Sequence, residues 1–390
     1  MVPLSYSVRS LARRPLTMVV TLVGLTLVVL VFAAVLMLSN GVRDTLAKNG
    51  SPDDFLAVRD GATSEATSLI SLDQVRLFSA EPELVRGTDG QPLIDAELVV
   101  IGSFERPNST GDANVLVRGV GPQAMAIRSS VKVVEGRAPH PETSEIMIGK
   151  SLVGRYAGFQ LGNKLNFAKR DWDIVGVFDA DGSALESEIW GDADQIGDAF
   201  SRKSAYSEIV GRLRDRASSI ALLQGRVASD PQLSTLKIWR EDSFYDTQSE
   251  KLRNLITGLG LFVAIIFSLA AALGAAITMY AQVAGRVREV GTLRAIGFRR
   301  RSVLGVFLRE ALLLSLAGGV LGIALASLFS LTSFSASNQD SFTDVTFHFR
   351  FGLGIAVKSL IFATLMGLLG GFSPAWRASR LSIVSATRGG

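Results

Sequence analysis

Residues 286–301 read RVREVGTLRAIGFRRR, and apolar runs long enough to cross a bilayer flank them on both sides. The basic residues of this segment, with Arg309 just beyond it, are Arg286, Arg288, Arg294, Arg299, Arg300 and Arg301. Positive charge is retained on the cytoplasmic side of membrane proteins, so the segment predicts the orientation of the whole chain. It is also short and compatible with a helix, and we expect a cytoplasmic partner to dock on it.

The composition is typical of a membrane protein. The 390 residues have a mean hydropathy of +0.32, with 48% hydrophobic and only 19% charged residues. The net charge of +4 is unevenly distributed, because residues 41–253 are net acidic and the basic excess borders the apolar runs. Membrane topology explains that excess, so we expect no nucleic-acid partner.

Several kinds of chemistry are missing from the sequence. It has no cysteine, which excludes disulfides and cysteine nucleophiles, and its two histidines, His140 and His348, are far apart in sequence. The one fragment similar to a phosphate-binding loop, at residues 149–151, has Ser144 where the first glycine should be. An acidic run that begins at Asp179 lacks the glycine and glutamate of a calcium loop. We therefore predict a non-enzymatic chain with no catalytic, cofactor-binding or metal-binding residues.

The apolar runs predict four membrane-spanning helices. Residues 16–38 carry no charge and, at about 1.5 Å per residue, are long enough for the roughly 30 Å hydrocarbon core. A cleaved signal peptide is the alternative, but its apolar part would have only about 7–15 residues. The fourth run, 351–376, is interrupted by Lys358, whose role stays open between snorkelling to the interface and an intramembrane function.

The predicted fold class is an α-helical membrane protein with a large α+β domain inserted between the first and second helices. The predicted order is a cytoplasmic interfacial helix (1–15), spans at 16–40, 254–285, 302–335 and 351–376, an outer domain (41–253), a cytoplasmic segment (286–301), a short outer loop (336–350) and a cytoplasmic tail (377–390). An even number of spans places both termini in the cytoplasm. Glycines at 318 and 322, and at 367 and 371, predict close packing between helices of the same chain.

The outer domain has the alternating Val- and Ile-rich runs and turn residues of a mixed fold. The predicted strands are 55–58, 96–101, 114–118, 144–148, 172–178 and 208–213, and the predicted helices are 72–80, 151–156, 192–200 and 217–228. We predict a membrane-proximal lobe made of 41–100 and 203–252, and a distal lobe made of 101–202.

Four motifs in this order resemble those of the MacB/FtsX-type permeases, the membrane subunits of type VII ABC transporters. They are REVGTLRAIG at 288–297, REA at 309–311 followed by Gly318, Gly319 and Gly322, SPAWRASR at 373–380, and, in the outer domain, residues 172–178 followed by ESEIW at 186–190. The resemblance covers nearly the whole chain.

The resemblance implies a homodimeric permease of the bacterial inner membrane, with a periplasmic large domain and a separate ABC ATPase dimer as its partner. ATP and Mg would bind to that partner, and no cofactor to this chain. The family's coupling helix, which contacts the ATPase, corresponds here to Arg288, Glu289, Gly291, Arg294, Gly297, Arg299 and Arg300. Arginines expected at the cytoplasmic membrane surface, in contact with lipid, are Arg9, Arg13, Arg14, Arg377 and Arg380. For Arg288, Arg294, Arg299, Arg300 and Arg301, the alternative is that they only set the topology.

The resemblance also implies a function, mechanotransmission, in which ATP-driven closure of the partner moves the outer domain. We expect this movement to serve export with a periplasmic adaptor of the membrane-fusion type and an outer-membrane duct. Two alternatives stay open: extraction of lipid or lipoprotein from the inner membrane, and a regulatory scaffold for a periplasmic enzyme. The sequence does not identify the substrate, nor does it distinguish a homodimer from a heterodimer.

Overall fold

A computed structural model describes residues 15–87, 90–106, 112–214, 218–337 and 344–380. The chain forms two compact units. The first, here called the helical unit, comprises Met1–Asn40, Asn254–Ser333 and Phe349–Gly390. The second, here called the sheet domain, comprises Gly41–Arg253 and Phe334–His348.

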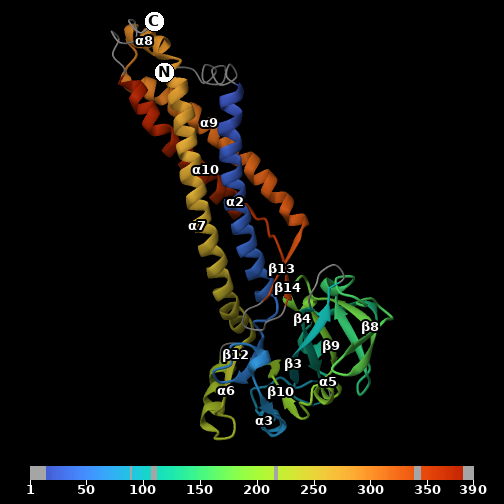
Figure 1. Cartoon of the computed structure of the whole chain (residues 1–390). Helices are drawn as coiled ribbons and strands as arrows, with labels where there is room; N and C mark the ends of the chain where they lie inside the picture. The colour runs from blue at the N-terminus through green and yellow to red at the C-terminus, as the bar shows by residue number, and fades with distance from the viewer. Residues whose placement is uncertain (1–14, 88–89, 107–111, 215–217, 338–343, 381–390) are drawn as a thin grey trace. The chain divides into compact units, whose positions relative to one another are not determined.

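Among the described residues, four helices are long and apolar enough to cross a membrane, which confirms the predicted fold class. These are α2 (Pro15–Ala47), α7 (Glu241–Ala284), α9 (Arg300–Ser327, extended by the 3₁₀ turn η4, Leu328–Leu331) and α10 (Leu353–Ser379). A short helix, α8 (Val287–Ala295), connects α7 to α9 (Figure 1). The uncharged part of α7 begins after Arg253, so its membrane-crossing part is 254–284, and Glu241–Arg253 belongs to the sheet domain.

Glycines let these helices pack closely, as the sequence predicted. A Cβ atom built on Gly322 of α9 would lie 2.7 Å from the carbonyl oxygen of Thr26 in α2. One built on Gly367 of α10 would lie 2.2 Å from Oγ of Ser315 in α9. Both glycine pairs therefore hold neighbouring helices of one chain together, since only glycine lets the backbones approach this far.

The sequence pattern at Ser373 and Pro374, an N-cap followed by proline, predicts the start of a new helix, and this prediction is wrong. Pro374 lies buried inside α10, which continues to Ser379. The hydroxyl of Ser373 bonds that of Tyr280 in α7 at 2.6 Å instead of capping a helix. A proline is tolerated inside a membrane helix because packed neighbours stabilise the interrupted backbone.

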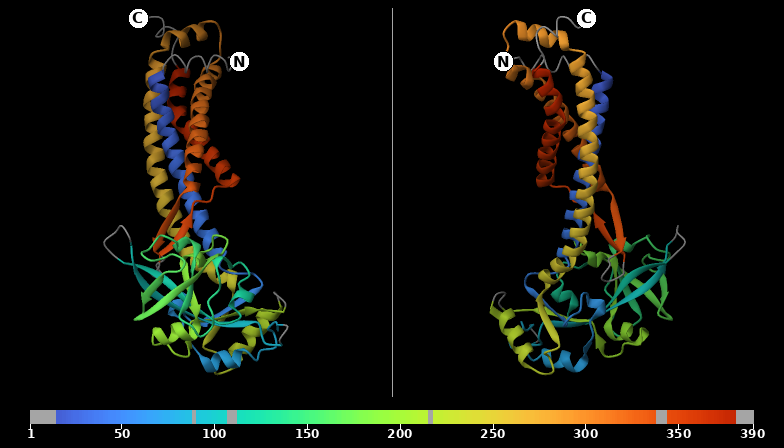
Figure 2. Two further views of the ribbon diagram at one scale, coloured as in Figure 1. Left: turned by 90° about the vertical axis from the view of Figure 1, so that its right-hand side faces the viewer. Right: turned by 60° about the vertical axis from the view of Figure 1, so that its left-hand side comes forward.

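The sheet domain contains a ten-stranded sheet in the order β12-β1-β11-β3-β4-β9-β6-β8-β5, with β7 paired to β8. Figure 2 shows its strands from two sides. Its strands are β1 (Asp54–Arg59), β3 (Ile94–Glu105), β4 (Asp112–Val120), β5 (Lys132–Gly136), β6 (Glu145–Gly149), β7 (Lys164–Phe167), β8 (Arg170–Asp179), β9 (Glu188–Asp192), β11 (Glu208–Arg212) and β12 (Leu236–Arg240). The pairs β4–β9 and β6–β8 are parallel, and the others are antiparallel. Two short strands, β2 (Ile70–Ser71) and β10 (Ala205–Tyr206), pair separately.

Short helices accompany the sheet. They are η1 (Glu65–Thr67), α3 (Leu72–Phe78), α4 (Ala124–Ile127), η2 (Lys150–Leu152), η3 (Ala184–Ser187), α5 (Ala193–Ala199) and α6 (Ser218–Ser229). Asp192 caps α5 by accepting from the amides of Asp194 and Gln195. The helix predicted at 151–156 is wrong, because only the 3₁₀ turn η2 forms there and Gly154 then takes a positive φ of 68°.

The hydrophobic residues of the sheet domain form separate clusters. One cluster contains Phe55, Phe78, Leu223 and Ile238, and another contains Val115, Phe159, Trp172 and Ile189. The predicted division into two lobes does not separate all the clusters, because a further cluster joins Ile127 of the predicted distal lobe to Leu56 and Val210 of the predicted proximal lobe. The predicted boundary at residue 100 also lies inside β3, so one continuous strand joins the two parts.

The outer loop predicted between the third and fourth spans forms a hairpin instead. Strands β13 (Ser333–Ser337) and β14 (Asp344–His348) pair with each other. Val345 and Phe347 of β14 are buried, and the amide of Thr346 donates to Oγ of Ser187 at 3.2 Å. This hairpin, orange in Figure 2, is therefore part of the sheet domain.

Two buried arginines, Arg118 of β4 and Arg128 after α4, share a group of buried glutamates in the sheet domain. Arg118 Nε donates to Glu188 Oε2 at 2.7 Å, and its Nη1 donates to Glu97 Oε2 at 2.7 Å and to Glu208. Carboxylates outnumber guanidiniums in this cluster, so the folded state retains protons on some of them. Burial accordingly raises the pKa of Glu208 well above its usual range.

Adding a methyl group at the α2–α9 contact should destabilise the helical unit. We expect Gly322→Ala to lower the free energy of unfolding by about 1–3 kcal/mol, because its Cβ meets backbone that cannot move aside. Gly274→Ala in α7 is the matched control, since a Cβ there meets nothing within 4 Å. Thermal unfolding in detergent, followed by far-UV circular dichroism, measures both, and equal midpoints would contradict the predicted clash.

The sheet domain should lose stability as the pH rises from about 5 to about 8. Burial, and next the charge of Glu97, raise the pKa of Asp95 to about 7, so the folded state binds a proton there that the unfolded state has released. The stability that this proton contributes is complete below the pKa of Asp95 in the unfolded state. It is lost as the pH rises through the pKa of Asp95 in the folded state. Unfolding followed by tryptophan fluorescence should show a falling midpoint, because Trp172 and Trp190 are buried in this domain. Asp95→Asn should flatten the fall, and a wild-type midpoint that is constant or rises would refute the prediction.

Candidate functional site

The segment between α7 and α9 contains the predicted coupling residues. Within 286–301 the structure forms a helix only from Val287 to Ala295, as α8. Arg300 and Arg301 already belong to the first turn of α9. The predicted segment is therefore a short helix, a turn and the beginning of the next helix.

Gly297 ends α8 in a defined way. Its φ of +100° is a conformation that residues with a side chain rarely adopt. The amide of Phe298 bonds the carbonyl of Leu293 at 3.1 Å, and the amide of Gly297 bonds that of Arg294 at 3.1 Å. These two bonds form a Schellman motif, which usually brings the residue after the glycine into apolar contact with the last turn. Leu293 and Phe298 accordingly line the same pocket.

Arg286, just before α8, attaches the segment to α9. Its Nη1 donates to both carboxylate oxygens of Glu310 at 3.0 Å, and its Nε donates to Glu289 Oε2 at 3.0 Å. The guanidinium also lies over the ring of Phe307, 5.3 Å from its centroid. Arg286 is 7% exposed and Glu310 1% exposed, so both charges depend on this pairing. Breaking it would leave an uncompensated charge inside the helical unit.

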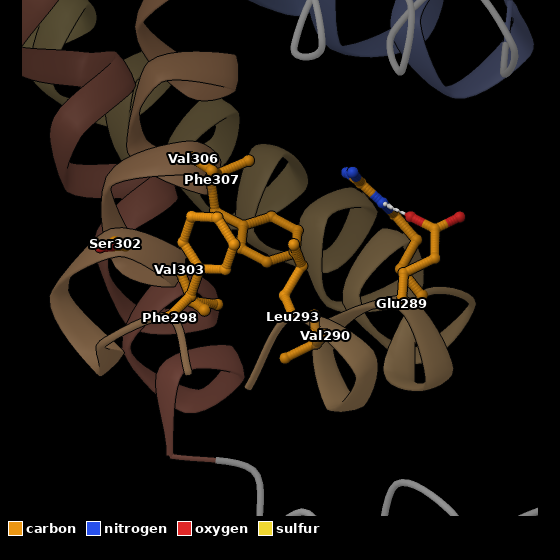
Figure 3. A pocket seen from close by; sticks show the side chains of 9 residues that line it. Glu289, Val290, Leu293, Phe298, Ser302, Val303, Val306 and Phe307 are labelled. Carbon is orange, nitrogen blue, oxygen red and sulfur yellow. Dashed lines mark hydrogen bonds and ion pairs between the residues drawn. The ribbon is translucent and has the colours of Figure 1, made fainter. Parts of the chain in front are cut away.

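Apolar side chains between α8 and α9 also hold α8 in place. Val290 of α8 is 3% exposed and packs with Val303 and Phe307 of α9. Figure 3 shows the apolar side chains of α8 and α9 around a common pocket, with Glu289 at one side, where a dashed line marks its ion pair. The helix is thus fixed on its inner face by contacts with α9.

The predicted coupling residues divide into two groups. Arg288, Arg299 and Arg300 are exposed, and so is Glu289, whose carboxylate pairs with Arg286. Gly291 is buried, and the half-buried Arg294 directs Nη1 to the carbonyl of Phe298 at 3.5 Å. In the described structure, Gly291 and Arg294 therefore contribute to the shape of the segment. The coupling role of all these residues stays a prediction.

Sequence reasoning missed three residues of this site. Arg286 was read only as part of the charge pattern, and Glu310 only as part of a motif, although an ionisable residue in an apolar run is itself a signal. Ile296 is 71% exposed at the turn after α8. It lies beyond the helix, so the amphipathic pattern of α8 gave no signal for it.

The expected membrane-surface arginines are only partly described. Arg377 lies over the ring of Tyr280 at 5.8 Å, and Arg380 lies over that of Trp376 at 4.6 Å. Both are exposed at the C-terminal end of α10, where positive charge interacts favourably with the helix dipole. Arg9, Arg13 and Arg14 lie outside the described residues. Lys358 is exposed on α10.

Profiles of two protein families match this chain. The MacB-like periplasmic core domain matches residues 16–225, which is more than half of the chain. The FtsX-like permease C-terminal domain matches residues 261–383, which include α8 and the Arg286–Glu310 pair.

Curated proteins named MacB are similar in sequence to this chain. The macrolide export ATP-binding/permease protein MacB of Bordetella avium is 24% identical over 395 residues, covering 96% of this chain and 57% of the relative. The protein of that name from Hahella chejuensis is 25% identical over 321 residues, covering 77% of this chain and 47% of the relative. The chain thus spans about half the length of these relatives.

Solved structures align with part of the chain. The periplasmic region of MacB from Actinobacillus actinomycetemcomitans aligns with a TM-score of 0.38 and 16% identity, covering 50% of this chain and 92% of that one. The extracellular domain of the noncanonic ABC-type transporter YknZ from Gram-positive bacteria aligns with a TM-score of 0.35 and 12% identity, covering 48% and 99%.

Replacing Gly297 should loosen the end of α8. A left-handed conformation costs a residue with a side chain about 1–2 kcal/mol, so in Gly297→Ala we expect amide hydrogen exchange at 296–298 to be roughly 5–30-fold faster. The site has open space around the added methyl group, so the backbone conformation alone causes the effect. Gly305→Ala in α9 is the control, because its methyl group also meets open space and its φ is helical. Unchanged protection in Gly297→Ala would contradict the role of the motif.

Proposed function

The chain belongs to the family of FtsX-like permeases with a MacB-like periplasmic core domain, and we propose that it is an ABC transporter subunit that transmits ATP-driven movement to its sheet domain. The observation that carries this proposal is the attachment of α8. The helix is fixed on its inner face by Arg286 and Val290, and its outer face and tip are exposed. A partner ATPase, which would bind ATP and Mg, would contact this outer face.

The exposed surface of the segment has a composition suited to docking. Ile296 projects from the tip with 71% of its surface exposed, and the exposed side chains of Arg288, Arg299 and Arg300 are nearby in sequence. An apolar anchor with a basic rim fits a partner groove that is apolar in its centre and acidic at its edge. We therefore assign ATPase contact to the exposed predicted residues and to Ile296.

Movement at α8 would reach the sheet domain through α7. This helix is continuous from Glu241 to Ala284, with its first residues in the sheet domain and the remainder in the helical unit. The partner can shift the permease between two states only by the difference in its affinity for them. The ATPase must therefore hold α8 differently in its open and closed forms.

The names of the relatives suggest the direction of transport. The relatives are named as macrolide export proteins, and we propose that this chain acts in export. By the same reasoning it would act as a pair of identical chains in the bacterial inner membrane, with a periplasmic adaptor of the membrane-fusion type and an outer-membrane duct.

Assembly in lipid nanodiscs tests the proposal. ATP turnover would be measured for the chain with its candidate ATPase, with and without the candidate adaptor. Turnover that depends on the chain and changes with the adaptor supports export. Stimulation by lipoprotein or lipid, with no response to an adaptor, would favour extraction, and turnover independent of the chain would refute coupling.

A polar residue at the tip of the segment should weaken ATPase binding. Burying an isoleucine contributes about 1.5–3 kcal/mol, so we expect Ile296→Ser to lower the affinity for the ATPase about tenfold or more. Because Ile296 is exposed, the unfolding midpoint of the isolated chain should not change. Leu222→Ser on α6, a residue 58% exposed in the sheet domain, is the matched control. Equal affinities in a titration of the nanodisc-embedded variants would remove Ile296 from the interface.

A further inference from the structure

Two distant parts of the chain meet at Arg128 in the sheet domain. One is the segment that follows α2, at Asn49, Gly50 and Ser51, and the other is Glu241, the first residue of α7. The amide of Ser51 donates to Glu241 Oε2 at 2.8 Å. A Cβ on Gly50 would lie 2.6 Å from the backbone of Glu241, so the two segments are in direct backbone contact.

Arg128 connects this meeting point to the sheet. Its Nη1 donates to Glu241 Oε1 at 2.7 Å and lies 3.5 Å from the carbonyl oxygen of Asn49. Its Nε and Nη2 donate to the two carboxylate oxygens of Glu97 on β3, each at 3.0 Å. A weaker bond of 3.4 Å reaches Glu208 on β11. One guanidinium thus bonds the first residue of α7 and two neighbouring strands.

We propose that Arg128 and Glu241 are positioning residues that pass movement of α7 to strands β3 and β11. This inference rests on the proposed function and names the contact through which that function would reach the sheet. Arg128 is 4% exposed and Glu241 1% exposed, so water cannot replace either partner. The Arg128–Glu241 contact is directional and short, and a displacement of the first turn of α7 must either move Glu97 with it or break the contact.

The other buried arginine provides a comparison within the same network. Arg118 bonds Glu188, whose carboxylate also accepts from Nε1 of Trp190 at 2.8 Å. Both of these partners are on strands, and Glu188 is 2% exposed. Glu188 and Glu241 are therefore buried glutamates that each bond an arginine, but only Glu241 is on α7.

The charge on Glu241 should control how firmly the contact holds. The charged groups that face it are Arg128, Asp54 of β1, Glu97 of β3 and Arg212 of β11. Burial raises the pKa of Glu241 to about 7, against the opposing effect of Arg128. The carboxylate is thus mostly ionised at pH 8, where it forms a charge-assisted bond, and mostly protonated at pH 6, where the bond is weaker.

Hydrogen exchange of the full chain, assembled with its candidate ATPase in nanodiscs, tests this inference. The rate of amide hydrogen exchange in β3 and β11 would be measured with and without ADP–vanadate, at pH 6 and at pH 8. The difference at each pH would be divided by the amount of vanadate trapped at that pH. We expect a nucleotide-dependent change that is larger at pH 8. Glu241→Gln keeps an acceptor for Arg128 but never carries the charge, so it should lower the change at pH 8 to that of the wild type at pH 6 and remove the pH dependence. Glu188→Gln, the matched control, should retain the change and its pH dependence.

Each outcome has a distinct meaning. If the wild type shows no nucleotide-dependent change in the sheet domain at either pH, the proposed function fails, and this inference with it. If the wild type responds and Glu241→Gln responds equally, the proposed function stands and the Arg128–Glu241 contact is not the route. If Glu241→Gln does not fold, Asp95→Asn decides, because it removes the other carboxyl group whose pKa is raised to about 7: a response of that variant that is still weaker at pH 6 supports the inference, and equal responses overturn it.

Discussion

Arg118 lies in the middle of the ten-stranded sheet and bonds carboxylates on the strands around it: Glu188 on β9, Glu97 on β3 and Glu208 on β11. Because β11, β3, β4 and β9 are neighbours in that order, one guanidinium connects four consecutive strands. Removing the guanidinium would leave buried carboxylates without a partner charge, at a cost of about 3–5 kcal/mol. The strand order and the network therefore depend on each other, and the position of Arg128 beside them follows from both.

A similar arrangement is found at the two ends of α7. Glu241, its first residue, bonds Arg128 in the sheet domain, and Arg286, just after its last residue, bonds Glu310 in the helical unit. Between them, the membrane-crossing part of α7 is largely apolar and exposed, and hydroxyl bonds join it to α2 from Thr278 to Thr21 and from Thr257 to Ser39, each at 2.9 Å. The buried ion pairs thus lie at the two ends of the helix, whereas hydroxyl bonds and apolar contacts join its length to the neighbouring helices.

The sequence predicted what depends on local pattern and composition. Uncharged runs gave the spans, and Val-rich runs gave β1, β3 and β4. It did not predict the buried ion pairs, because Arg118 and Glu188 are 70 positions apart and Arg128 and Glu241 are 113 apart. It also missed the β13–β14 hairpin and the continuation of α10 through Pro374, since both depend on neighbours that only the folded chain supplies. At the candidate site, charge and motif indicated the segment, and burial then separated its anchoring residues from its exposed ones.

Strand β12 pairs with β1, with Arg240 opposite Phe55, so this edge of the sheet is completed only after most of the sheet domain has been synthesised. At roughly 5–20 residues per second, the ribosome needs on the order of 10–40 s to synthesise the chain between these two strands. Until β11 has been made, β1 has neither of its neighbours in the sheet, and contacts this far apart in sequence form slowly. The membrane-crossing part of α7 follows soon after Arg240 in the sequence. Insertion of the second span and addition of the edge strand β12 to the sheet therefore take place in the same short period of biosynthesis.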